Sequence, residues 1–119
     1  MDDKRIFVSK GWGYEHWIVN KEEYCGKLLF VKKGKKTSWH YHKEKDETLY
    51  VNLGILEVKW GWDDRLTPDF THTTILEEGD SFHVPVLMRH QLKGLSDVDL
   101  FEFSTQHFDE DSIRVIKGD

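Results

Sequence analysis

The chain has 119 residues, which suits a single domain with one hydrophobic core. Its net charge of −5 argues against a general role in binding nucleic acid or anionic membranes, and its five Trp, four Tyr and seven Phe argue against disorder. Cys25 is the only cysteine, so no intrachain disulfide can form, and the sequence has neither a signal-peptide pattern nor an apolar run of membrane-spanning length. We therefore expect a cytoplasmic protein.

Short apolar or alternating runs follow one another along the chain, separated by turn signals rich in Gly, Asp and Asn. The opening run, at 5–20, predicts one or two strands. Four more runs predict further strands, at 26–36, 47–62, 72–85 and 89–104. The tail, at 107–119, is compatible with a short helix or with a final strand. Because long helical periodicity is absent, we predict an all-β domain, an antiparallel sandwich or barrel.

The first candidate site is a pair of histidines one residue apart, His40 and His42. Side chains two residues apart on a strand share a face, so both imidazoles point the same way. The charged segment 43–46 predicts a hairpin turn. After this turn, Glu47 is predicted to face the barrel interior, because it has the same parity as the apolar residues Leu49, Val51 and Leu53.

A third histidine, His90, shares parity with Met88 and Leu92 on a strand far away in the sequence, so it can also face inward. A buried carboxylate beside imidazoles is costly unless it is paired or bound to a metal. Three imidazoles and Glu47 converging in an apolar barrel describe a mononuclear site for one divalent transition metal ion, with Zn, Fe, Mn and Ni as candidates. A lone His-x-His pair is more often solvated, but Glu47 and His90 favour the metal site here.

These residues carry a resemblance to the cupins. The first cupin motif has Gly, five residues, His-x-His, four residues, Glu, six residues and Gly, and this chain matches it with Gly34, His40, His42, Glu47 and Gly54. The second motif is matched by Gly79, Pro85 and His90, while Leu87 stands at its second Gly and Gly94 at its closing Asn. The chain resembles a small single-domain cupin.

The resemblance implies a jelly-roll barrel, the double-stranded β-helix, which is often dimeric. It also implies that the metal is held by His40, His42, Glu47 and His90. Within one cupin domain spanning 1–119, we expect N-terminal strands at 1–27, the barrel with both motifs at 28–105 and a C-terminal extension at 106–119. Because an open sandwich leaves edges that need cover, we also expect a homodimer built partly from the N-terminal strands.

The ends of the chain resemble type II mannose-6-phosphate isomerases. The matching positions are Trp12, Gly13, Glu102, Asp109, Asp111, Ile113 and Arg114. The chain departs from that family at 47–49, which reads Glu-Thr-Leu in place of Glu-His-Trp. The resemblance implies the interconversion of an aldose and a ketose, free or phosphorylated, through an enediol, with the metal acting as a Lewis acid.

Three residues outside the metal set are candidates for catalysis. In an alternating run, Glu102 lies on the face opposite Phe101 and Phe103, so it can point inward and carry a proton between substrate carbons. Equally, Glu102 could pair structurally with Arg89 or Arg114. These two arginines are the candidates for holding a phosphate, because a guanidinium group binds it through two parallel hydrogen bonds.

Two other functions stay open for the same site. An Fe(II)-dependent oxygenase would use open metal positions beside the histidines for O₂ chemistry. A non-catalytic cupin would bind a carbohydrate, or keep the metal for structure alone. The expected partner is a small molecule, a sugar or sugar phosphate for the favoured isomerase, rather than nucleic acid or membrane. Fold does not decide between these functions, because cupins host many chemistries.

Overall fold

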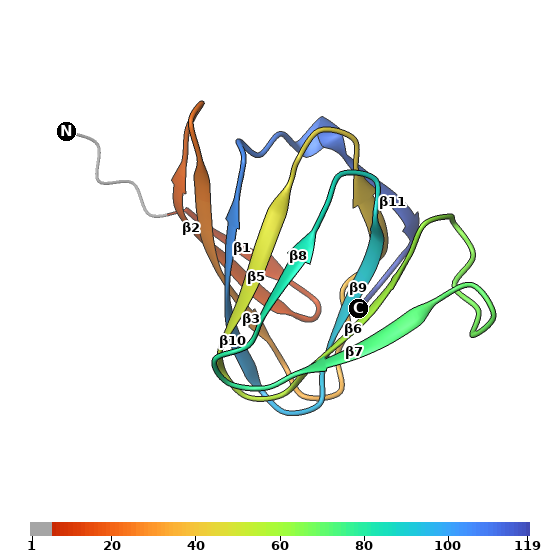
Figure 1. Ribbon diagram of the computed structural model, residues 1–119. Helices are drawn as coiled ribbons and strands as arrows, with labels where there is room; N and C mark the ends of the chain where they lie inside the picture. The colour runs from red at the N-terminus through yellow and green to blue at the C-terminus, as the bar shows by residue number, and fades with distance from the viewer. Residues whose placement is uncertain (1–5) are drawn as a thin grey trace.

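The computed structural model describes residues 6–119, which form two antiparallel β-sheets that face each other (Figure 1). The first sheet contains, in spatial order, β1 (Ile6–Lys10), β2 (Gly13–Asn20), β3 (Cys25–Val31), β10 (Val98–Ser104), β5 (Glu47–Leu53) and β8 (Ser81–Val84). The second contains β11 (Ser112–Ile116), β4 (Trp39–His42), β9 (Arg89–Gly94), β6 (Leu56–Gly61) and β7 (His72–Leu76). The predicted all-β class is confirmed.

Alternation along the strands builds the core between the two sheets. On β10, Leu100 is buried and Glu102 lies on the same inner face, while Phe103 is exposed on the outer face. On β5, Leu49 and Val51 are likewise buried. The inner faces of both sheets therefore supply one continuous apolar cluster, as expected for an antiparallel sandwich with period-two strands.

The tail contains both a short helical turn and a final strand, the two structures that its sequence allowed. A single 3₁₀ turn, η1 (Asp109–Asp111), leads into β11, which pairs with β4. The Asp111 carboxylate is buried and accepts the backbone N–H groups of Lys43, Glu44 and Lys45 at 3.0, 2.9 and 3.0 Å. The tail thereby fixes the turn between β4 and β5, which joins the two histidines of β4 to Glu47.

Leu87 has a φ of 74°, in the left-handed region that glycine normally occupies. It stands where the second cupin motif has a glycine. Its N–H donates to the His42 carbonyl at 2.9 Å, so this turn is attached to the end of β4. The turn leads directly into β9 and sets the start of the strand that carries His90.

None of the helical structure found in residues 6–119 is long and apolar enough to cross a membrane.

Replacing Asp111 with Ala should lower the free energy of unfolding by about 2–4 kcal/mol, because three backbone N–H groups lose a charged acceptor. Urea unfolding of the two proteins would measure this loss. Glu110→Ala removes the same charge from an exposed neighbour in the same turn and should change the stability by less than about 0.5 kcal/mol. Equal losses in the two variants would contradict the role given to Asp111.

Candidate metal centre

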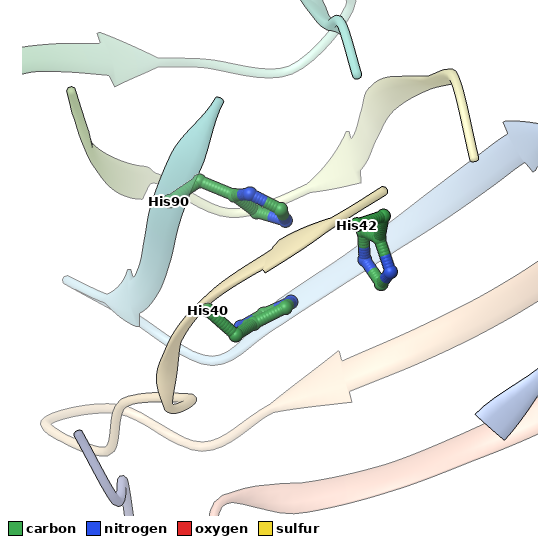
Figure 2. Close-up of side chains that lie close together, drawn as sticks. All are labelled: His40, His42 and His90. Carbon is green, nitrogen blue, oxygen red and sulfur yellow. The ribbon is translucent and has the colours of Figure 1, made fainter. Parts of the chain in front are cut away.

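Three imidazoles meet between the sheets. His40 and His42 extend from β4 and His90 from β9, and Figure 2 shows the three rings directed toward one another. His40 and His90 are direct partners in the register of the two strands. One nitrogen from each ring can be chosen so that all three lie within 4.8 Å of one another, a spacing that suits a single metal ion.

Backbone carbonyl groups orient two of the rings. The Nδ1 atom of His40 lies 2.9 Å from the Ser38 carbonyl oxygen, and Nδ1 of His90 lies 3.0 Å from that of Met88. A nitrogen that donates to a carbonyl carries the ring proton, so Nε2 of each neutral ring keeps its lone pair for a ligand. Burial lowers the pKa of His40 to about 3 and that of His90 to about 4, which keeps both rings neutral.

His42 is the third imidazole of the cluster. Its Nδ1 is buried and has no hydrogen-bond partner among the residues that the structure describes. Burial, followed by the positive charge of Lys45, holds the pKa of His42 far below its ordinary value, so this ring is neutral as well. A neutral imidazole with a buried polar atom left unpaired fits a metal-ligand set better than it fits a packed core.

Glu47, the first residue of β5, joins the three histidines. Its Oε1 atom lies 3.0 Å from Nε2 of His90 and 3.6 Å from Nε2 of His42. Burial, and next the charge of Glu102, raises the pKa of Glu47 to about 8. The Glu47 carboxyl group therefore takes up a proton more readily than an exposed glutamate does, and its Oε1 atom lies within hydrogen-bond distance of Nε2 of His90. A cation could replace this proton and ionise the carboxyl group, so the four side chains fit a divalent metal.

Lys45 is the main feature of the site that sequence reasoning missed. It lies in the charged segment that was predicted only as a hairpin turn, yet its side chain is just 3% exposed. Its Nζ atom lies 2.9 Å from Oε2 of Glu102, 3.8 Å from Oε2 of Glu47 and 3.2 Å from Nδ1 of His107. The sequence did contain one indication of this position. Lys45 precedes the inward-facing Glu47 by two residues, and side chains two residues apart on an extended segment point the same way.

Glu102 faces the interior, as its alternation with the phenylalanines predicted. Burial alone would raise its pKa, but the ammonium groups of Lys45 and Lys27 outweigh burial and hold the pKa well below its ordinary value. For Lys45, burial acts to lower the pKa, and the carboxylates of Glu102 and Glu47 outweigh it and raise the pKa. Glu102 and Lys45 therefore form a buried, ionised pair beside the histidines.

The structure separates the two candidate arginines. Arg89 donates through Nε to Asp64 at 3.0 Å, and its guanidinium lies 3.6 Å from the centre of the Tyr41 ring. Tyr41 alternates with His40 and His42, so Arg89 lies on the opposite face of the sheet and does not line the histidine cavity. The pairing of Glu102 with Arg89 that the sequence left open is not formed; Lys45 is the partner instead.

Arg114 lies near the mouth of the site. On β11 it is the register partner of His40, so the two side chains share a face of the sheet. It lines a groove of about 380 Å³ that adjoins the histidine cavity, and the two spaces share the residues Lys10, Glu15, His107 and Ser112. Among residues 6–119, no carboxylate lies within ion-pairing distance of Arg114.

The cavity that contains the histidines is small, with a volume of about 100 Å³. Strands of both sheets line it, and its walls combine the polar cluster with the apolar side chains of Trp12, Leu29, Leu49 and Leu92. Of the other histidines, His83 pairs with Asp46 at 2.7 Å and does not line the cavity. A space of this size admits a metal ion together with a small ligand group.

Comparisons with known proteins agree with this architecture. The Cupin domain family matches residues 27–103, whereas no curated protein matches the chain. CapF from Staphylococcus aureus, described as a capsular polysaccharide assembling protein, superposes with a TM-score of 0.80 at 14% identity, over 97% of this chain and 32% of CapF. Oxalate decarboxylase from Bacillus subtilis superposes with a TM-score of 0.79 at 17% identity, over 92% of this chain and 30% of the enzyme.

KdgF from Halomonas sp. is closer in length, with a TM-score of 0.68 at 18% identity over 82% of this chain and 81% of KdgF. By contrast, this chain spans about a third of the length of CapF and of oxalate decarboxylase. At these identities the likeness shows the fold alone.

The family match and the fold lead to the same result. The match at 27–103 includes every residue of the two motifs, from the first glycine to the last histidine. The solved structures that resemble this chain share its jelly-roll arrangement of two facing sheets, so the predicted fold is confirmed. In this fold, the cluster of three histidines indicates a site for a divalent metal. The chain belongs to the cupin family.

Proposed function

We propose that the protein is a mononuclear metal-binding cupin in which His40, His42, Glu47 and His90 hold one divalent transition metal ion. The observation that carries this proposal is the convergence of three neutral imidazoles and a buried carboxyl group on one small cavity. Two of the imidazoles have the carbonyl partners that orient metal-binding histidines in other proteins.

The favoured reaction is the isomerisation of a sugar or sugar phosphate between aldose and ketose. A bound metal would supply Lewis acidity to oxygen atoms of the substrate. Glu102 would take a proton from one carbon and return it to the next, since it faces the same cavity and is held as a carboxylate. Its ion pair with Lys45 weakens it as a base, so substrate binding must loosen that pair before the proton moves.

Arg114 is the residue proposed to hold the anionic end of a phosphorylated substrate. It lies in the groove next to the cavity, and no carboxylate among the described residues neutralises it. A guanidinium group suits phosphate because its donors match two phosphate oxygens. Arg89 is not retained for this role, because it is bound to Asp64 on the other face of the sheet.

The purified protein should carry about one divalent metal ion per chain, measured by elemental analysis. The combined replacement of His40 and His42 with Ala should abolish the bound metal, because two of the three imidazoles are lost. His83→Ala is the matched control, since His83 lies outside the cavity and should leave the metal content unchanged. Undiminished metal in the double variant would refute the site.

Metal-loaded protein should interconvert an aldose and a ketose in a panel of hexoses and hexose 6-phosphates followed by NMR. Glu102→Gln should lower the turnover by about 100-fold or more with the metal retained, whereas Glu44→Gln, on the exposed turn, should not. Consumption of O₂ that depends on Fe(II) would favour the oxygenase instead. Binding of a sugar without any conversion would favour the non-catalytic cupin.

We also propose that the protein is a homodimer that uses the outer face of the first sheet. Across the register of its strands, Phe7, His16, Leu28, Phe101 and Tyr50 form one row on this face. Phe7 is 59% and Phe103 54% exposed. A face with several exposed aromatic side chains is suited to contact with a second copy.

Light scattering should give the mass of a dimer at micromolar concentration. Replacing Phe7 and Phe103 together with Ser should give a monomer, because the two most exposed aromatic residues of the face are removed. Trp62→Ser is the control, since Trp62 is 56% exposed but follows β6 in the other sheet. A monomeric wild-type protein would contradict the dimer.

A further inference from the structure

The walls of the histidine cavity contain equal numbers of acidic and basic side chains. Three lysines and three glutamates line it, namely Lys10, Lys27, Lys45, Glu15, Glu47 and Glu102. When all six groups are ionised, their charges cancel. A divalent ion bound by the neutral histidines and Glu47 would then leave two positive charges that no wall residue compensates. In a small cavity enclosed by strands of both sheets, such an excess favours a ligand that is itself negatively charged.

The three lysines are not equivalent. Lys27 lies 3.5 Å from the Glu15 carboxylate and stacks over the Trp17 ring at 4.4 Å, and Lys10 also faces Glu15, at 3.8 Å. These two cations are thus engaged with the Glu15 carboxylate. Lys45 alone lies within 4 Å of the proposed metal ligand Glu47. Its ammonium group is therefore the protein cation placed to share a ligand with the metal.

The position of the Lys45 ammonium is fixed by neighbouring groups. Nε2 of His107 lies 2.9 Å from Oδ1 of Asp109, so the carboxylate accepts the ring proton there and leaves Nδ1 free to accept from Lys45. The carboxylate of Glu102 accepts a second ammonium hydrogen at 2.9 Å. The third ammonium hydrogen has no acceptor within hydrogen-bond distance among the described residues and remains for a ligand.

We propose that Lys45 is a ligand-binding residue of this cavity, and that the ligand oxygen bound there is negatively charged, held between the metal and the Lys45 ammonium. The inference rests on the metal site proposed above. The ligand class it assigns is small oxyanions, such as a carboxylate with a neighbouring hydroxyl group, which differ in charge from the sugar oxygens of the isomerase reaction. It also gives the buried Lys45 a role in addition to neutralising Glu102.

The test compares glycolate with glycolamide, two probes of nearly the same shape that differ by one negative charge. Dissociation constants for both would be measured by ligand-observed NMR on metal-loaded protein. Wild-type protein should prefer glycolate. Lys45→Met should weaken glycolate binding about tenfold or more, the factor associated with one charge-assisted hydrogen bond, and change glycolamide binding by less than about twofold.

Two further variants keep the test decisive. Lys43→Met removes the same charge from an exposed position in the same turn and should change neither constant. Lys45→Met leaves the Glu102 carboxylate buried without its partner, which can unfold the protein. Lys45→Met combined with Glu102→Gln removes both charges, so it should fold, keep its metal and show the same loss of glycolate affinity.

The outcomes separate the two proposals. Wild-type protein that holds no metal would overturn the metal site and this inference together. Metal-loaded Lys45 variants that bind glycolate within about twofold of wild type would overturn the inference alone. Loss of metal from the double variant would also overturn it, because Lys45 would then act on the metal site and not on the ligand.

Discussion

Burying a carboxylate inside an apolar barrel is unfavourable by several kcal/mol unless an opposite charge is buried with it. The interior beside the histidines contains the carboxyl groups of Glu47 and Glu102, and the Lys45 ammonium lies within 4 Å of both. The Lys45 ammonium outweighs burial and keeps the pKa of Glu102 low, whereas burial and the charge of Glu102 raise the pKa of Glu47. Asp111 holds the turn that positions Lys45, so the chemistry of the cavity depends on contacts made by the tail.

Most of the fold and the residues proposed as metal ligands followed from local patterns. The period-two alternation along β5 and β10 is enough to predict that Glu47 and Glu102 face the interior, because apolar neighbours of the same parity define the buried face. The spacing of the two motifs also predicted that His90 lies beside His40 and His42 of β4, although the two strands are far apart in the sequence. Here local periodicity and a family pattern give the same result.

What the sequence did not indicate depends on contacts between distant segments. Lys45 looks like a solvated turn residue until Glu102, on a strand more than fifty residues away, supplies its buried partner. Arg89 and Arg114 were equivalent by residue type, and only the pairing of β4 with β11 and β9 separates them by face. Most of the tail forms a strand because β4 has an edge available for pairing, and β11 pairs with that edge.

Leu87 shows how the second motif tolerates a substitution. A leucine in the left-handed region has an unfavourable backbone energy of about 1–2 kcal/mol relative to glycine. Glycine, in turn, loses about 0.5–1 kcal/mol more in conformational entropy on folding, so the two residues differ little in net stability. The hydrogen bond from its N–H to the His42 carbonyl secures the same turn with either residue. A motif search that insists on glycine at this position would overlook barrels that are built in the same way.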